Sequence, residues 1–136
     1  MKIENHEAVM KEVLEEISEA LKDKRGLLAH QRRLAFALSM GAANLLELYF
    51  HRLQIIKEGS KINHLWFKRR KESVIEHIQK QITSPVDSVQ NIGQIIDIIV
   101  KIEEKRDDIA YGAPSSEKLL QEKINLFFEL RRLAGC

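Results

Sequence analysis

The residues best suited to chemistry lie together in the run KRDDIAYG, at positions 105–112. The run places an arginine, two carboxylates and a phenol at the predicted end of a helix. Backbone groups lose their intrahelical partners at a helix end and become available to a ligand or a partner chain. The sequence therefore predicts a binding site at this helix end, with Arg106, Asp107 and Tyr111 as its residues.

A second polar set follows helical steps of three and four residues, so that Asn44, Glu47 and His51 share one side of a predicted helix. Buried polar groups must be satisfied by partners. Two interpretations stay open. These side chains line a cleft beside Arg106, or they bond among themselves.

Two further pairs combine arginine and histidine. Arg25 and His30 flank Gly26 at a helix start, which we interpret as accidental. Arg70 and His77 return to within about 20° of the same helix face but roughly 10 Å apart along the axis. That pair could hold and attack a phosphodiester, or form a solvated face.

Between positions 64 and 71, His64, Trp66 and Phe67 are followed by four basic residues, 68–71. Such a run has cations for phosphates and rings for base stacking. Trp66 and Phe67 could instead be anchors in the hydrophobic core, and we favour this interpretation over base stacking.

Length and composition restrict the class of protein. The 136 residues suit one domain, 1–136, that buries a core without metal or disulfide staples. The single cysteine, Cys136, excludes an intramolecular disulfide and favours a reducing, cytoplasmic location with a harmless tail thiol. The longest uncharged stretch ends at Glu47 and is rich in small residues, so neither a signal peptide nor a membrane span is predicted.

Charge is unevenly distributed although the net charge is only +2. Residues 26–82 carry 10 basic and 4 acidic groups, which is +6, whereas residues 1–25 (5 and 7) and 83–136 (7 and 9) are each −2. The basic middle could serve an anionic partner or pair with the acidic segments inside the monomer.

Hydrophobic periodicity predicts an all-α fold, an up-and-down antiparallel bundle of four to five helices. The predicted helices span residues 3–23, 27–58, 71–82, 85–112 and 114–135, with Ser84-Pro85 and the residues around Ser116 as start signals. Ile98 and Val100 widen the apolar face of the fourth helix beyond one stripe, which favours self-association.

Three segments together resemble the HEPN superfamily of helical domains. They are ALSMGAANLLELYFHRLQIIKEG, INHLWFK and RDDIAYGAPSSEKLLQEKINLFFELRRL, and the likeness covers residues 27–133. The resemblance implies a helical bundle that pairs as a homodimer. It also implies a metal-independent ribonuclease, often a toxin with a nucleotidyltransferase-like antitoxin as partner, or a binding module that has lost catalysis.

The signature of that superfamily is an arginine and a histidine in the pattern Arg-x4-His, and the chain departs from it. Arg106 matches the arginine, but Tyr111 stands in place of the histidine. A phenol, with an ordinary pKa of about 10, is a poor base at neutral pH, whereas an imidazole suits the removal of a proton from the 2′-hydroxyl of RNA. Moreover, Arg106 and Tyr111 lie roughly 140° apart on a regular helix. They meet only if the helix loosens before Gly112 or across a dimer axis.

These features predict a homodimer that binds nucleotide or RNA at the Arg106–Tyr111 helix end, with weak or no catalysis. The alternatives are an endoribonuclease in which His51 or His77 supplies the imidazole, and a helical partner of a nucleotidyltransferase-like protein. The sequence has no Gly-rich phosphate loop, metal-ligand spacing or Ser-His-Asp arrangement, so neither a cofactor nor a metal is predicted.

Overall fold

The computed structural model describes residues 2–135, and it is helical throughout, so the predicted all-α bundle is confirmed. Cys136, the predicted tail thiol, lies outside the described residues. The elements in chain order are α1 (Ile3–Lys22), η1 (Leu27–His30), α2 (Gln31–Arg52), η2 (His64–Lys68), α3 (Lys71–Gln79), η3 (Val86–Ser88), α4 (Ile92–Glu103), α5 (Arg106–Tyr111) and α6 (Glu117–Leu133).

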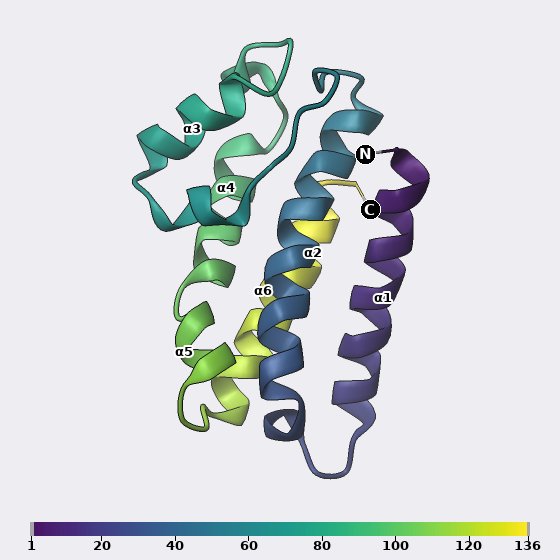
Figure 1. Cartoon of the computed structure of the whole chain (residues 1–136), viewed down its shortest axis with the longest axis vertical. Coiled ribbons are helices and arrows are strands. Elements are labelled where there is room, and N and C mark those ends of the chain that lie inside the picture. Colours follow the sequence, from purple (N-terminus) through teal and green to yellow (C-terminus); the bar gives the residue numbers. More distant parts are fainter. Residues whose placement is uncertain (1, 136) are drawn as a thin grey trace.

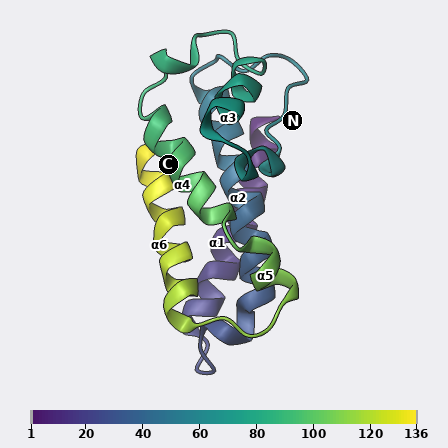
Figure 2. The same ribbon diagram turned by 90° about the vertical axis from the view of Figure 1, so that its left-hand side faces the viewer.

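Four long helices form an up-and-down bundle, in which α1 and α4 run in one direction and α2 and α6 in the other (Figure 1). The short α3 covers the end of the bundle beside α4, and α5 lies against α2 (Figure 2). Among residues 2–135, no helix combines the length and the apolar character needed to cross a membrane.

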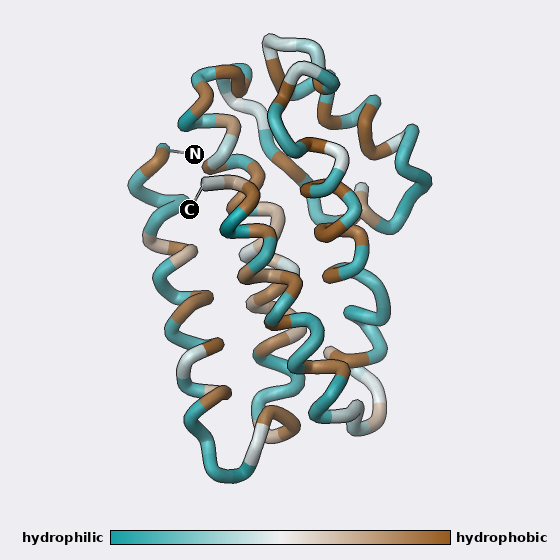
Figure 3. Tube along the Cα trace, turned by 180° about the vertical axis from the view of Figure 1, so that it is seen from behind, coloured by the Kyte–Doolittle hydropathy of each residue, from teal (hydrophilic) through white to brown (hydrophobic). Residues whose placement is uncertain are grey.

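Amphipathic stripes bring the long helices together. Hydrophobic positions recur every three or four residues along α1 and α6 (Figure 3). The four residues of α6 that were predicted to face inward are buried: Leu120, Ile124, Phe127 and Leu130. In contrast, α2 is buried on nearly every side, as expected for a helix surrounded by neighbours. It packs against α1, α4, α5 and α6 and is the central helix.

Small residues on α2 allow close packing, as the sequence indicates. A Cβ atom added at Gly41 would lie 2.9 Å from Phe127 and 3.0 Å from Val13. The absence of a side chain at Gly41 therefore lets α1 and α6 approach the middle of α2.

The predicted second helix is too long at both ends. Its first turn, Leu27–His30, is a 3-10 helix, and α2 ends at Arg52 rather than Glu58. Gln54 adopts a left-handed conformation, with φ of 58°, and the chain then runs extended. There Ile56 bridges Ile82 in antiparallel fashion, so α3 also ends early, at Gln79 rather than at Ile82.

The predicted fourth helix is divided into three pieces. Residues after Pro85 form only the 3-10 turn η3, and α4 begins at Ile92 after the left-handed Asn91. A second break falls at Lys105, whose φ is 61°, so Arg106 begins the short helix α5 instead of ending a long one. The side chain of Lys123 stabilises this break, because its Nζ donates to the carbonyl oxygens of Lys101 and Glu104.

The broad apolar face of α4 is used inside the monomer. Ile95, Ile96 and Ile99 are buried, and Ile98 and Val100 are partly buried against the same core. This face therefore supplies no separate evidence for self-association.

Side chains from the start of α2 hold α5 and the loop after it. Gln31 donates to the carbonyl oxygens of Ile109 and Ala113, at 2.9 and 3.1 Å, and Arg32 donates to that of Ala110 at 2.8 Å. These bonds satisfy backbone groups that a helix end leaves without partners. They fix α5 against α2, and with it the position of Arg106.

Candidate functional site

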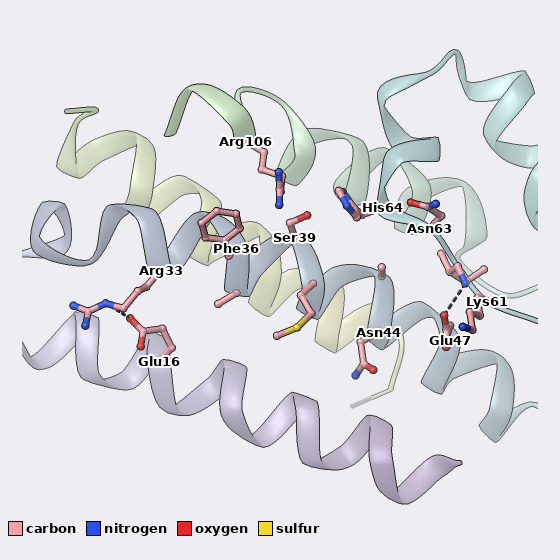
Figure 4. Close-up of a pocket in the computed structure, with 14 residues that line it drawn as sticks. Glu16, Arg33, Phe36, Ser39, Asn44, Glu47, Lys61, Asn63, His64 and Arg106 are labelled. Carbon is pink, nitrogen blue, oxygen red and sulfur yellow. Dashed lines mark hydrogen bonds and ion pairs between the residues drawn. The ribbon is translucent and has the colours of Figure 1, made fainter. Parts of the chain in front are cut away.

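A groove of about 740 Å³ runs along α2. One wall comes from α1, and the other from α5 and the segment 61–64 (Figure 4). Apolar side chains of α2 form its floor: Phe36, Ala37, Met40 and Ala43. Its polar residues include Arg33, Ser39, Lys61, His64 and Arg106.

Arg106 points from the start of α5 into this groove (Figure 4). Its side chain is only 14% exposed, and its guanidinium carbon lies 5.0 Å from the centre of the Phe36 ring, in a cation–π contact. Nη1 donates to Asp107 Oδ1 at 2.8 Å, whereas the buried Nε has no hydrogen-bond partner within residues 2–135. The groove thus contains a guanidinium group that is fixed in place by Asp107 and still has an N–H group without an acceptor among the described residues.

Asp107 lies outside the groove and holds Arg106 through an ion pair. Its second oxygen accepts from Lys68 Nζ at 2.8 Å, and its side chain is 55% exposed. The hydrogen bonds from Lys68 and then Arg106 lower the pKa of this carboxyl group. Asp107 is therefore placed as an ionised support for Arg106, and it does not line the groove.

Tyr111 and Arg106 are not brought together. Tyr111 lies at the far end of α5 and is 70% exposed, and it contacts the edge of Phe36 with ring centres 5.7 Å apart. Phe36 thus contacts both residues, but only Arg106 and Phe36 line the groove. Their separation follows from α5 staying helical up to Tyr111, so the loosening that could have joined them does not occur.

His64, Glu103 and Ser39 form a cluster beside Arg106 that the sequence did not predict. Glu103, with a side chain only 1% exposed, lies beneath the groove. The Ser39 hydroxyl donates to its Oε1, and His64 Nδ1 lies 3.4 Å from its Oε2. The imidazole is 32% exposed and lines the groove. A carboxylate that orients an imidazole is suited to acid–base chemistry near neutral pH.

Asn44 and Glu47 line the other end of the same groove, but their polar atoms are used internally. Asn44 Oδ1 lies 2.6 Å from Nδ1 of the fully buried His6, and Glu47 Oε2 lies 3.1 Å from its Nε2. The other Glu47 oxygen accepts from the Ile62 backbone at 2.6 Å. Both residues therefore line the groove and also hold α1, α2 and the 61–63 loop together.

His51 lies outside the groove. Its ring packs against His6, with centres 5.1 Å apart, and it lines a separate depression with Lys57 and residues at the start of α1. His51 follows Glu47 by one helical turn, but it lies about 18 Å along α2 from Ser39, which is beside Arg106 (Figure 4), and is therefore too far away to approach Arg106.

Arg25 and both histidines of the two arginine–histidine pairs have structural partners. Arg25 binds Asp23 at 2.8 Å, and the buried His30 lies between Glu16 and Asp23. His77 accepts from Arg69 Nη1 at 2.7 Å.

The aromatic residues of the 64–71 run serve mainly in packing. Phe67 is 1% exposed, and Trp66 packs partly buried against the core with its ring stacked on that of His77. The interpretation of both residues as core anchors agrees with these positions.

No protein-family model, curated protein or solved structure matches the chain. Within residues 2–135, no group of three or more histidine, cysteine, aspartate and glutamate side chains could hold a metal ion.

Proposed function

We propose that this chain is a HEPN-like helical module that binds nucleotide or RNA in the α2 groove, with weak or no catalysis. The observation that carries the proposal is Arg106, whose guanidinium is mostly buried, held by Asp107 and stacked near Phe36, with Nε unpaired. A guanidinium binds phosphate through charge-assisted hydrogen bonds, and an aromatic ring accepts a base by stacking. The groove offers both features side by side.

The proposal includes a homodimer in the cytoplasm, with the α5 ends of two copies together. Tyr111 supports this arrangement, because a phenol that is 70% exposed beside the 40% exposed Phe36 makes an aromatic surface suited to an interface. In a dimer, Tyr111 of one copy would complete the site near Arg106 of the other. A nucleotidyltransferase-like protein is the alternative partner for the same surface, and co-purification of a second polypeptide would favour it.

Binding is tested by titrating labelled oligouridylate or uridine monophosphate into the protein at 50 mM salt. Arg106→Ala should weaken binding by about tenfold to a hundredfold, the cost of losing hydrogen bonds to a charged group. Arg106→Lys should recover only part of the affinity, since it keeps the charge but loses the planar fork. Arg132→Ala removes an equivalent charge from the exposed face of α6 and is the matched control. Equal affinities for all four proteins would reject the proposal.

A second candidate is a metal-independent ribonuclease, and the His64–Glu103 pair is the observation that favours it. In that reaction His64 takes the proton of the 2′-hydroxyl, and the 2′-oxygen bonds to phosphorus. The bond to the 5′-oxygen breaks as this oxygen takes a proton from water, which leaves a 2′,3′-cyclic phosphate. Arg106 would bind the phosphate oxygens where charge develops.

Cleavage is tested by incubating structured RNA with the protein in a chelator. The ribonuclease candidate requires a cyclic-phosphate product that both His64→Ala and Arg106→Ala reduce at least a hundredfold. His77→Ala is the control, because His77 lies on α3 outside the groove. Intact RNA with the unmodified protein would leave binding as the function.

A further inference from the structure

The groove is longer than one nucleotide. Arg33 and Glu47 both line it from α2, and at 1.5 Å per residue they lie about 20 Å apart along the helix axis. Successive nucleotides advance by about 3.4 Å when stacked and roughly twice that when unstacked. The groove therefore has room for three unstacked nucleotides in a row.

Cations are spaced along this length. Figure 4 shows Arg33 towards one end, Lys61 at the other and Arg106 between them. The Arg33 side chain is 58% exposed, and Lys61 is exposed with no ion pair in the described part of the chain. Three positive side chains in sequence along one groove match the repeating charge of a nucleic-acid backbone better than the single charge centre of a mononucleotide.

The acidic residues of the groove offset these charges only in part. Glu16 is engaged by His30 at 3.0 Å and by Arg33 at 3.5 Å. Glu47 is engaged by His6 at 3.1 Å and by the Ile62 backbone at 2.6 Å. Of the three cations, Lys61 has no ion pair among residues 2–135, whereas Arg106 pairs with Asp107 and a phosphate at the mostly exposed Arg33 must share that guanidinium with Glu16.

The floor between the cations is apolar and accessible. Phe36 is 40% and Met40 48% exposed, although both lie on the helix at the centre of the bundle. Unpaired bases stack on such surfaces without preference for sequence, whereas a duplex hides its base faces. The floor therefore selects for a single strand.

We infer that the groove binds single-stranded nucleic acid as a run of about three nucleotides lying along α2. The bases contact Phe36 and Met40, and the phosphates bind Arg33, Arg106 and Lys61 in order. This inference rests on the proposed function and goes beyond it, because it specifies a polymer over a mononucleotide and gives the length and path of the strand.

The first test measures affinity for oligouridylates of one to six nucleotides. The dissociation constant should fall at least tenfold from one nucleotide to three and change less than threefold from four to six. For the 5′-phosphorylated trinucleotide, which carries three phosphates, the slope of log affinity against log salt should be about −2, the value for three neutralised phosphates on a single strand. A blunt duplex of the same length should bind at least tenfold more weakly.

The second test uses two variants at the ends of the groove. Arg33→Ala and Lys61→Ala should each reduce the gain in affinity between one and three nucleotides by about threefold or more, and each should make the salt slope shallower by about 0.7. Lys57→Ala, in a separate depression, is the matched control. Circular dichroism and thermal melting establish that each variant is folded before it is scored.

Two results separate this inference from the proposed function. If uridine monophosphate binds as tightly as the trinucleotide, the inference that the groove binds a strand is rejected, and the proposed nucleotide binding is retained. If no member of the series binds, the proposed function itself fails. Equal affinity for a duplex would also overturn the inference. An affinity that falls when the protein dimerises would overturn it as well, because the groove would then be occupied by a second copy of the chain.

Discussion

At the scale of single residues, Phe36 decides how the predicted site is arranged. The sequence places Arg106 and Tyr111 in one site, but in the structure each contacts the ring of Phe36 and Tyr111 does not line the groove. Phe36 is 75 residues before Tyr111 in the chain. Its role depends on a contact between two helices, for which helical periodicity provides no signal. The same holds for His64 and Glu103, which are 39 residues apart.

The buried His30 makes stability depend on pH. Its Nδ1 lies 3.0 Å from Glu16 and its Nε2 2.8 Å from Asp23, so both nitrogens face carboxylates. The hydrogen bond to Glu16, followed by that to Asp23, raises the pKa of His30 above its ordinary value of 6.5. A raised pKa means that the folded state binds the proton more tightly than the unfolded state does. The stabilisation is complete below pH 6.5 and is lost as the pH rises through the raised pKa.

We therefore expect His30→Gln to lower the free energy of unfolding by about 1 to 3 kcal/mol at pH 6, the cost of breaking hydrogen bonds to a charged group in a buried site. The difference between the two proteins should shrink steadily towards pH 9. Urea unfolding at half-unit pH steps measures it. A difference that stayed constant from pH 6 to pH 9 would show that His30 acts by packing alone.

At the scale of elements, the break between α4 and α5 positions the site. Lys123, on α6, donates to the carbonyl oxygens of Lys101 and Glu104 at the end of α4. Burial lowers the pKa of this ammonium group, yet it bonds two carbonyls that the helix end leaves free. The break turns the chain so that Arg106 begins α5 and enters the groove.

Lys123→Met tests this role of α6. The apolar stem is retained but two backbone acceptors lose their donor, so the protein should lose about 1 to 3 kcal/mol of unfolding free energy. Nucleotide affinity should also fall, since the start of α5 is no longer fixed. Lys118→Met, on the exposed face of the same helix, is the control for both measurements. Equal values for the two variants would mean that the carbonyls are satisfied in another way.

Helices are predictable here where one face is buried. The periodic stripes of α1 and α6 and the Ser116 cap, which accepts from the Leu119 backbone at 3.0 Å, follow from local sequence. The break at Lys105 does not, because a lysine in a left-handed conformation carries none of the glycine or proline signals of a helix end. It is stabilised by a side chain on another helix, and for that reason Arg106 begins a short helix, whereas the sequence predicted it near the end of a long one.

At the scale of the whole molecule, the basic middle segment has two uses. It pairs with the acidic segments on either side, as in Arg52 with Glu7 and Lys68 with Asp107. It also supplies Arg33 and Lys61 to the groove. Internal pairing is therefore observed, and Arg33 takes part in it as well, because it pairs with Glu16 at 3.5 Å, whereas an anionic partner remains the proposal for the groove.

Salt should separate these two uses. The ion pairs between segments are largely exposed, with Lys71 and Asp97 at 44% and 56%, and such pairs contribute about 0 to 1 kcal/mol each. Raising sodium chloride from 50 to 500 mM should therefore change the unfolding free energy by less than about 1 kcal/mol. Nucleic-acid binding should weaken by about a hundredfold over the same range, because three neutralised phosphates give a slope of about −2. Chemical denaturation with urea and fluorescence anisotropy at matched salt concentrations measure the two effects. If stability fell by several kcal/mol while binding did not respond, the charge of the middle segment would serve to hold the bundle together and the groove would bind an uncharged ligand.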